Sequence, residues 1–180
     1  MADLGPVPWP PAPIITERIV LREPEARDRA ALVDLFTSAE VGAYIGGPRQ
    51  RDEFERALPE IPPRRPGLFV VDLAGTMIGT ITLDRRDADR LGRLLPEGGE
   101  PELGYLFLPG SWGRGYATEA CTAALSWFDS ALPGEPVVLT TQTANLPSLR
   151  LAARLGFTEV ERFEQYGAEQ WFGARWPPSV

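Results

Sequence analysis

The sequence predicts an α/β protein built on a central sheet of mixed strand direction, and two observations lead to this class. Stretches rich in β-branched and aromatic residues alternate with stretches in which apolar residues recur at helical spacing. Their order is a strand, two helices, three strands, a helix, a strand, a helix and two strands. Elements in this order are typical of one sheet with helices packed on its faces.

The strands are expected where β-branched and aromatic residues lie between turn-forming residues. They fall at 14–24, twice within 67–84 around a turn at Ala74–Gly75, at 101–110, at 135–143, and twice within 158–176 around Gly167. The helices are expected at 25–38, 51–58, 116–131 and 147–155, each with apolar residues on one face. Residues 85–99 are charged and end in glycines, so they predict a loop.

The domain organisation is expected to be simple. Residues 1–13 are rich in proline and predict an extended arm, whereas residues 14–180 predict one domain of ordinary size without an internal repeat. No stretch is apolar enough for a membrane span, and the N-terminus has no basic region followed by an apolar one. One cysteine excludes an internal disulfide, so a cytoplasmic location is expected.

Charge and composition exclude several classes of function. The net charge of -7 argues against a nucleic-acid binder, which normally has a basic face. The sequence contains no histidine, which excludes Ser-His-Asp and Cys-His catalysis and removes the commonest zinc ligand. Without histidine, acid–base chemistry must use carboxylates, hydroxyls, amines or water. The sequence also contains no metal-binding constellation.

The stretch PGSWGRGYATEA at residues 109–120 is the strongest single motif. Its glycines directly precede a predicted helix, whose unpaired N–H groups and positive dipole end favour an anion such as phosphate. A Walker loop would need Lys and Ser or Thr after Gly115, and a dinucleotide fold would need a third glycine at Thr118. Neither pattern fits, and a simple turn is the alternative to a phosphate site.

Four stretches together resemble the GNAT superfamily of acetyl-CoA-dependent N-acetyltransferases, and more narrowly its RimJ/RimL-like branch of ribosomal-protein N-terminal acetyltransferases. They are TERIVLRE, ELGYLFLPGSWGRGYATEA, NLPSLRLAARLGF and ERFEQY, which span nearly the whole chain in the family's order. Trp112 stands where the wider superfamily has Gln or Arg, and this exchange is familiar in the branch. Ala152 stands where many members carry a tyrosine.

The resemblance implies the fold and the cofactor site. The fold would be a mixed, mostly antiparallel sheet of about six to seven strands with about four helices, and a splayed strand pair would hold CoA. The pyrophosphate would meet the loop N–H groups, and pantetheine would lie along the strand and beside Asn145, which otherwise shapes a turn. The implied cofactor-binding residues are Leu106, Phe107, Leu108, Trp112, Gly113, Arg114, Gly115, Tyr116, Ala117, Asn145 and Ser148.

Acetyl transfer to an amine needs a base, a donor for the thioester oxygen, and a donor for the departing thiolate. The resemblance makes Glu102 the candidate base, with Glu100 and Asp84 in reserve; the alternative is an exposed glutamate at a strand start. A backbone N–H near Leu106 or Phe107 would meet the oxygen. Ser148 is the candidate acid, whose hydroxyl would donate to the thiolate sulfur, or else it would cap its helix.

The sequence therefore predicts an N-acetyltransferase whose acceptor is a protein N-terminus or a small amine. A catalytically weak CoA-binding module of the same fold is the alternative, because the tyrosine is missing at Ala152. Glu119 is expected to serve the first turn of its helix, and Cys121 to lie in the core. No metal, nucleic acid or membrane partner is expected, and a homodimer is implied by the resemblance alone.

Overall fold

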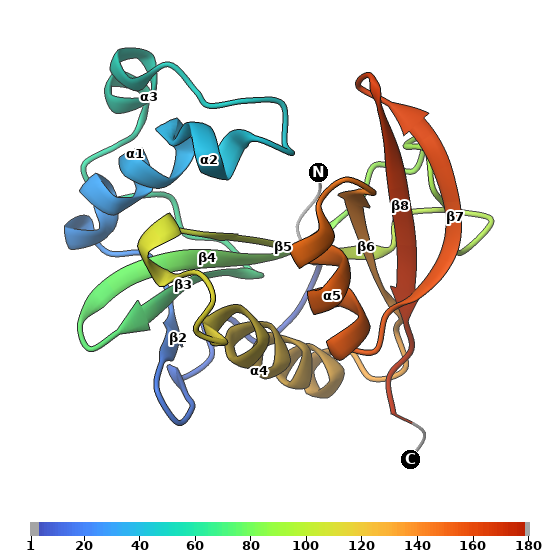
Figure 1. The fold of residues 1–180 in the computed structure, drawn as a ribbon. Helices are drawn as coiled ribbons and strands as arrows, with labels where there is room; N and C mark the ends of the chain where they lie inside the picture. The colour runs from blue at the N-terminus through green and yellow to red at the C-terminus, as the bar shows by residue number, and fades with distance from the viewer. Residues whose placement is uncertain (1–3, 179–180) are drawn as a thin grey trace.

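The computed structural model describes residues 4–178, in which eight strands form one sheet (Figure 1). Their order across the sheet is β1-β2-β3-β4-β5-β6-β8-β7. In chain order they are β1 (Ile14–Ile15), β2 (Val20–Arg22), β3 (Leu68–Leu73), β4 (Thr76–Arg85), β5 (Pro101–Phe107), β6 (Val137–Gln142), β7 (Thr158–Gln165) and β8 (Ala168–Arg175). This confirms the α/β sheet of mixed, mostly antiparallel direction that the sequence predicts.

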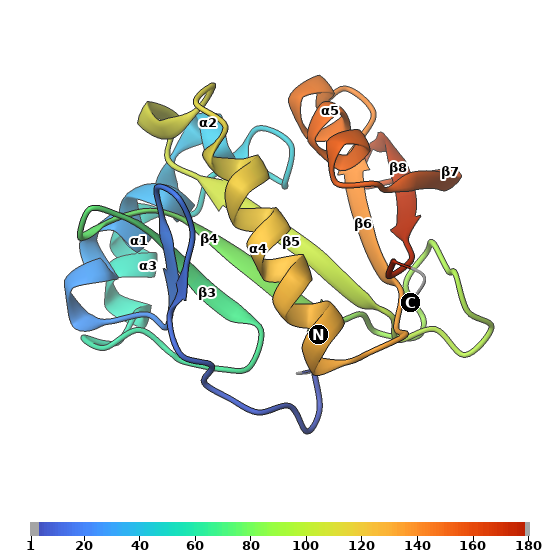
Figure 2. The same ribbon diagram turned by 90° about the horizontal axis from the view of Figure 1, so that it is seen from below.

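The helices lie on both faces of this sheet (Figures 1 and 2). On one face α4 crosses the strands and packs with α5 on the main core, whereas α1 and α2 cover the other face through a smaller core. The α-helices are α1 (Arg29–Thr37), α2 (Ala39–Gly42), α3 (Arg51–Ala57), α4 (Tyr116–Ala131) and α5 (Leu146–Arg154). Two 3₁₀ turns, η1 (Ala26–Asp28) and η2 (Pro109–Ser111), precede α1 and α4.

One strand pair differs from all others in the sheet. Neighbouring strands pair antiparallel except β5 and β6, which run parallel and share one register position, Glu102 with Val138. Figure 2 shows the two ribbons diverging from this join toward their carboxyl ends. Parallel neighbours that pair along their length would bond the facing N–H and C=O groups to each other, so the divergence leaves those of β5 without a strand partner beyond the join.

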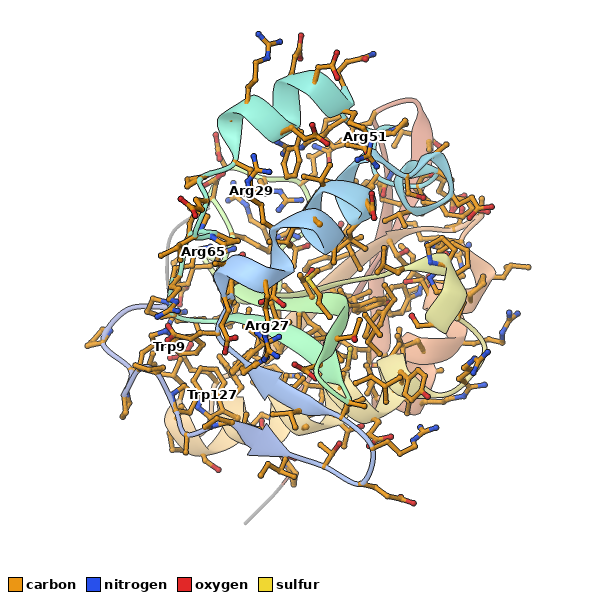
Figure 3. The ribbon with its side chains drawn as sticks, turned by 90° about the vertical axis from the view of Figure 1, so that its left-hand side faces the viewer. Trp9, Arg27, Arg29, Arg51, Arg65 and Trp127 are labelled. Atoms are coloured by element: carbon orange, nitrogen blue, oxygen red, sulfur yellow. The ribbon has the colours of Figure 1, made fainter. Side chains whose placement is uncertain are left out.

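The N-terminal stretch within the described residues packs on the body of the protein. Leu4 is 1% exposed and belongs to the main core. Trp9 makes edge contacts with Phe69 of β3 and Trp127 of α4, at centroid distances of 5.1 and 5.6 Å (Figure 3). Such aromatic contacts hold the stretch against the sheet although it has almost no regular secondary structure.

The structure differs from the expected elements at the start of the chain. The strand expected over 14–24 is a hairpin of two short strands, because Thr16 N–H donates to the Ile19 carbonyl and turns the chain. The helix expected over 25–38 begins with η1 and is followed by the unexpected α2, where the Ser38 hydroxyl accepts from Val41 N–H as an N-cap. The remaining strands and helices lie where the sequence predicts them.

Candidate active site

The glycine-rich loop leads from the end of β5 into α4. Gly113 and Gly115 have φ of 73° and 80°, in the left-handed region that suits glycine, and Gly115 is the N-cap of α4. As a glycine, Gly115 has no side chain with which to cap this end of the 16-residue helix. The first N–H groups of α4 and the positive end of its dipole therefore remain available to an anion.

Trp112 and Ser111 tie this loop to the strand before it. The Trp112 indole N–H donates to the Phe107 carbonyl at 2.8 Å, and the Ser111 hydroxyl donates to the Leu108 carbonyl at 2.7 Å. These bonds fix the loop to Phe107, the last residue of β5, and to Leu108, which follows it. Trp112 stands where the superfamily that the sequence resembles has Gln or Arg, and its indole hydrogen bond anchors the start of the loop.

The β1–β2 turn holds the other side of the loop, a contact that the sequence did not reveal. The Glu119 carboxylate accepts from the Thr16 hydroxyl at 2.6 Å, Arg18 N–H at 2.8 Å and Arg18 Nε at 2.7 Å. Arg18 also donates to the Arg114 carbonyl at 2.8 Å, and its guanidinium lies 4.6 Å from the Tyr116 ring centre. Partial burial works to raise the pKa of Glu119, but these hydrogen bonds outweigh it and leave the pKa below its usual range.

The backbone of β5 presents its free groups to the gap beside β6. Leu108 N–H donates to the Ile78 carbonyl of the neighbouring segment, and antiparallel pairing alternates along a strand. The N–H of Leu106 consequently faces β4, whereas those of Tyr105 and Phe107 face β6. Of the two oxyanion donors expected from the sequence, Phe107 points into the gap and Leu106 points away from it.

Across this gap, α5 places a serine against a tyrosine of β5. Tyr105 Oη and Ser148 Oγ are 2.5 Å apart. The N-cap of α5 is Asn145, whose side-chain oxygen accepts from Ser148 N–H at 3.3 Å. The capping role considered for Ser148 therefore belongs to Asn145, and the Ser148 hydroxyl is directed to another partner. Tyr105 is not among the site residues predicted from the sequence, because its hydroxyl partner Ser148 lies on a different element.

Glu102 lies at the join of β5 and β6, in a network of charged and polar groups. Its carboxylate accepts from Arg86 at 2.6 Å, Arg90 at 2.7 Å and the Thr140 hydroxyl of β6 at 2.7 Å. The Arg86 side chain is 1% exposed and also donates to the Leu91 and Gly92 carbonyls. This network fastens the 86–100 loop to the one point at which β5 and β6 pair.

The two reserve carboxylates are also engaged. Glu100 is 2% exposed and accepts from the N–H groups of Leu94 and Leu95 at 2.7 Å each. Asp84 is buried and ion-paired with Arg65. Burial raises the pKa of Asp84 above its ordinary value although Arg65 opposes this. Both side chains thus have structural partners that a role as base would disturb.

The predicted site residues gather in two groups on opposite faces of the sheet. The loop 112–117, Asn145 and Ser148 lie with α4 and α5, where Tyr105 packs against the main core. Glu102 alternates with Tyr105 and lies on the other face. Cys121 is fully buried in the main core, and burial raises the pKa of its thiol, so it remains a thiol. Among residues 4–178, no three His, Cys, Asp or Glu side chains cluster as for a metal ion.

Comparison with known proteins identifies the class that this fold and loop define. The model of the Acetyltransferase (GNAT) domain matches residues 18–158. A curated relative, the uncharacterized protein YkkB of Bacillus subtilis, is 31% identical over 151 residues, which are 79% of this chain and 83% of YkkB. The chain belongs to the GNAT acetyltransferase family, and it is an acetyltransferase.

Solved structures show the same fold at lower identity. A GNAT-family acetyltransferase from Bacillus anthracis aligns with a TM-score of 0.75 at 21% identity, over 92% of this chain and 98% of that one. RimL, a ribosomal L7/L12 alpha-N-protein acetyltransferase, in complex with coenzyme A aligns with a TM-score of 0.70 at 14% identity, over 92% and 98%. No helix of the described chain is long and apolar enough to cross a membrane.

Proposed function

We propose that this protein is an acetyl-CoA-dependent N-acetyltransferase that moves the acetyl group to a primary amine by direct attack within a ternary complex. The observation that carries the proposal is the divergence of β5 from β6 beyond Glu102, directly beside the glycine loop. A long acyl carrier with a charged end fits such a gap, because the strand offers free N–H groups and the loop offers an anion site.

The loop supplies the grip on the pyrophosphate. Backbone N–H groups of Gly113 to Ala117 bind the negative charge, and α4 adds its dipole at that point. The contacts of Trp112 and Arg18 hold the loop in position before the ligand arrives, which lowers the entropic cost of binding. Arg114 is proposed to add its positive charge at the same anion.

The pantetheine arm is proposed to lie in the gap along residues 105–108 and beside Asn145. The acetyl oxygen would receive a hydrogen bond from a backbone donor of β5, and Phe107 is favoured because its N–H faces the gap. A fixed donor at the developing oxyanion stabilises the transition state more than the ground state. The side-chain hydroxyl of Ser148 is proposed to donate to the sulfur as the thiolate leaves.

Glu102 is our candidate base, acting on the face opposite Ser148 so that the acceptor and the sulfur lie on different sides of the thioester. In this role the carboxylate must release a partner, and Arg90 is the more exposed of its two guanidinium groups, at 28% against 1% for Arg86. A chain of water molecules is the competing route for the proton. For an α-amine with a pKa of about 7.7–8.0, either route suffices.

The acceptor is proposed to be a protein N-terminal α-amine or a small-molecule amine. The similarity to RimL favours the first at the level of fold only. We place the activity in the cytoplasm, because a chain with one buried cysteine suits a reducing compartment. A homodimer is a further expectation, which light scattering of the purified protein tests.

The function is tested by two measurements on the purified chain. Calorimetric titration is expected to show acetyl-CoA binding, and a panel of peptide α-amines and small amines is expected to give acceptor-dependent release of CoA thiol. Binding without thiol release from any acceptor would favour the alternative, a CoA-binding module without turnover. Failure to bind acetyl-CoA would contradict both.

A further inference from the structure

Tyr105 and Ser148 form a hydroxyl pair that reaches across the gap between β5 and α5. Tyr105 lies in the middle of β5, opposite Ile81, and packs against the main core on the side of α4 and α5. Ser148 is 7% exposed and lies in the first turn of α5, on the same helix face as Leu151 and Ala152. Their oxygens are 2.5 Å apart, so one hydroxyl donates to the other.

Chemistry indicates which hydroxyl donates. The phenol is the stronger acid and therefore the better donor, and burial raises the pKa of Tyr105 well above its usual range, so the phenol keeps its proton. The titratable group that faces it is the buried thiol of Cys121 on α4. With Tyr105 as donor, the Ser148 oxygen acts as acceptor and its own hydrogen is free to point elsewhere.

The remaining bonds of α5 leave that hydrogen in the gap. The Ser148 N–H is held by Asn145, and the Ser148 hydroxyl has no second hydrogen bond within residues 4–178. A free serine hydroxyl rotates among several acceptors, including carbonyls of its own helix. A donor fixed on its oxygen removes part of this freedom and directs the hydrogen away from the phenol.

We propose that Tyr105 is a positioning residue for acetyl transfer: its phenol donates to the Ser148 oxygen and thereby orients the Ser148 hydrogen toward the sulfur of CoA. The inference rests on the proposed function. During transfer the amine nitrogen forms the C–N bond and loses its proton to the base. The C–S bond breaks and its electron pair goes to sulfur, where Ser148 holds the charge by a hydrogen bond without giving up its proton.

This arrangement explains how the chain manages without a tyrosine at position 152. Ala152 is fully buried, so a phenol at this position would have to displace the side chains around it. The phenol comes instead from β5 and acts through Ser148. Ser148 thus joins two elements that the sequence separates by more than forty residues.

The test uses Tyr105→Phe, which removes only the hydroxyl, with Ser148→Ala, the double variant, and Tyr166→Phe as control. Tyr166 is 84% exposed in the β7–β8 turn. The thiol of enzyme-bound CoA is titrated by thiolate absorbance, which needs no acceptor. We expect Tyr105→Phe to raise the pKa of the bound thiol by about one unit, the effect of losing a well-aligned charged hydrogen bond.

Further outcomes distinguish positioning from packing. Ser148→Ala is expected to raise the thiol pKa at least as much, and the double variant no further than Ser148→Ala alone, because Tyr105 acts on the sulfur only through Ser148. CoA affinity stays within about threefold, and the single-turnover rate falls roughly tenfold per folded molecule. Tyr166→Phe changes none of these.

An unchanged thiol pKa in Tyr105→Phe, or additive shifts in the double variant, would overturn the inference while acetyl transfer by the wild type stands. If the wild type binds no CoA, the proposed function fails and the inference fails with it. The two failures are therefore distinct, since the first occurs with CoA bound and the second without binding.

Discussion

At the scale of single residues, Glu102 has two competing roles that the structure makes separable. Its carboxylate holds Arg86, Arg90 and Thr140 at the join of β5 and β6, whereas the proposed mechanism asks it to accept a proton. Removing one partner from a mostly buried ion pair costs about 3 kcal/mol, because the remaining charge is left without compensation. A change at Glu102 must therefore be measured for stability and for rate.

We expect Glu102→Gln to lower the free energy of unfolding by about 3 kcal/mol and the turnover per folded molecule by roughly 10²-fold. Acetyl-CoA affinity should change little, since the loop is intact. The rate should recover at high pH, where the amine loses its proton unaided. Denaturant unfolding and the pH dependence of turnover check this. A normal rate at neutral pH would leave Glu102 only its structural role and assign the proton to water.

At the scale of elements, the loop and the start of α4 are proposed to hold the charged end of acetyl-CoA. Gly115 has φ of 80°, and a Cβ there would lie 3.3 Å from the Arg18 guanidinium. A branched side chain is strained in this backbone conformation and fills the approach to the first N–H groups of α4. The loop therefore depends on glycine for both conformation and access.

We expect Gly115→Val to weaken acetyl-CoA binding by tenfold or more, about the loss of one or two hydrogen bonds to a charged group. Gly134→Val is the matched control, because Gly134 has φ of 85° beyond the other end of α4. Calorimetric titration compares the two variants. Equal affinity of the two variants for acetyl-CoA would show that the loop takes no part in phosphate binding. Equal melting temperatures would show that valine strains the backbone of both variants to the same extent, so that strain does not account for a difference in affinity.

The β1–β2 turn is the second element that bears on the loop. The Glu119 carboxylate on α4 accepts hydrogen bonds from the Thr16 hydroxyl and the Arg18 guanidinium. Arg18 also donates to the Arg114 carbonyl of the loop. We expect Glu119→Ala to release the turn and to weaken acetyl-CoA binding roughly fivefold through lost preorganisation. Glu135→Ala, which breaks the Arg85 ion pair past the far end of α4, serves as control. An unchanged dissociation constant would show that the loop holds its shape without the turn.

At the scale of the whole molecule, one charged network connects the N-terminal hairpin, η1 and the central sheet. Arg22 of β2 donates to both oxygens of Asp28, at 2.7 and 2.8 Å, and to Asp72 of β3 at 2.8 Å. Arg27 extends it at the surface (Figure 3). Burial works to raise the pKa of Asp28, but the bonds from Arg22 and the Glu25 N–H leave the pKa below its ordinary value.

The lowered pKa of Asp28 makes the stability of the fold depend on pH. A carboxyl whose folded pKa lies below its unfolded value stabilises the protein above the unfolded pKa, near 3.9, and this contribution is lost as the pH falls through the folded pKa. We expect Asp28→Asn to lower the free energy of unfolding by about 3 kcal/mol at pH 7 and by clearly less at pH 3. Urea unfolding at both values checks this; an equal difference at both would contradict the pKa argument.

From the sequence alone we could predict the order and type of nearly all elements and the glycine loop, and the resemblance of four stretches indicated the family. The elements and the loop depend on local signals: the spacing of apolar residues, turn-forming residues, and glycines that only a special backbone conformation requires. Tertiary structure added a distant support to the hairpin at 14–24: the local bond from Thr16 N–H to the Ile19 carbonyl turns the chain, and Glu119, more than a hundred positions away, accepts from Arg18 N–H in that turn. It also decided the partners of Glu102 and the meeting of Tyr105 with Ser148. Such contacts join residues on different strands and helices, and local pattern carries no information about which side chains the folded chain brings together.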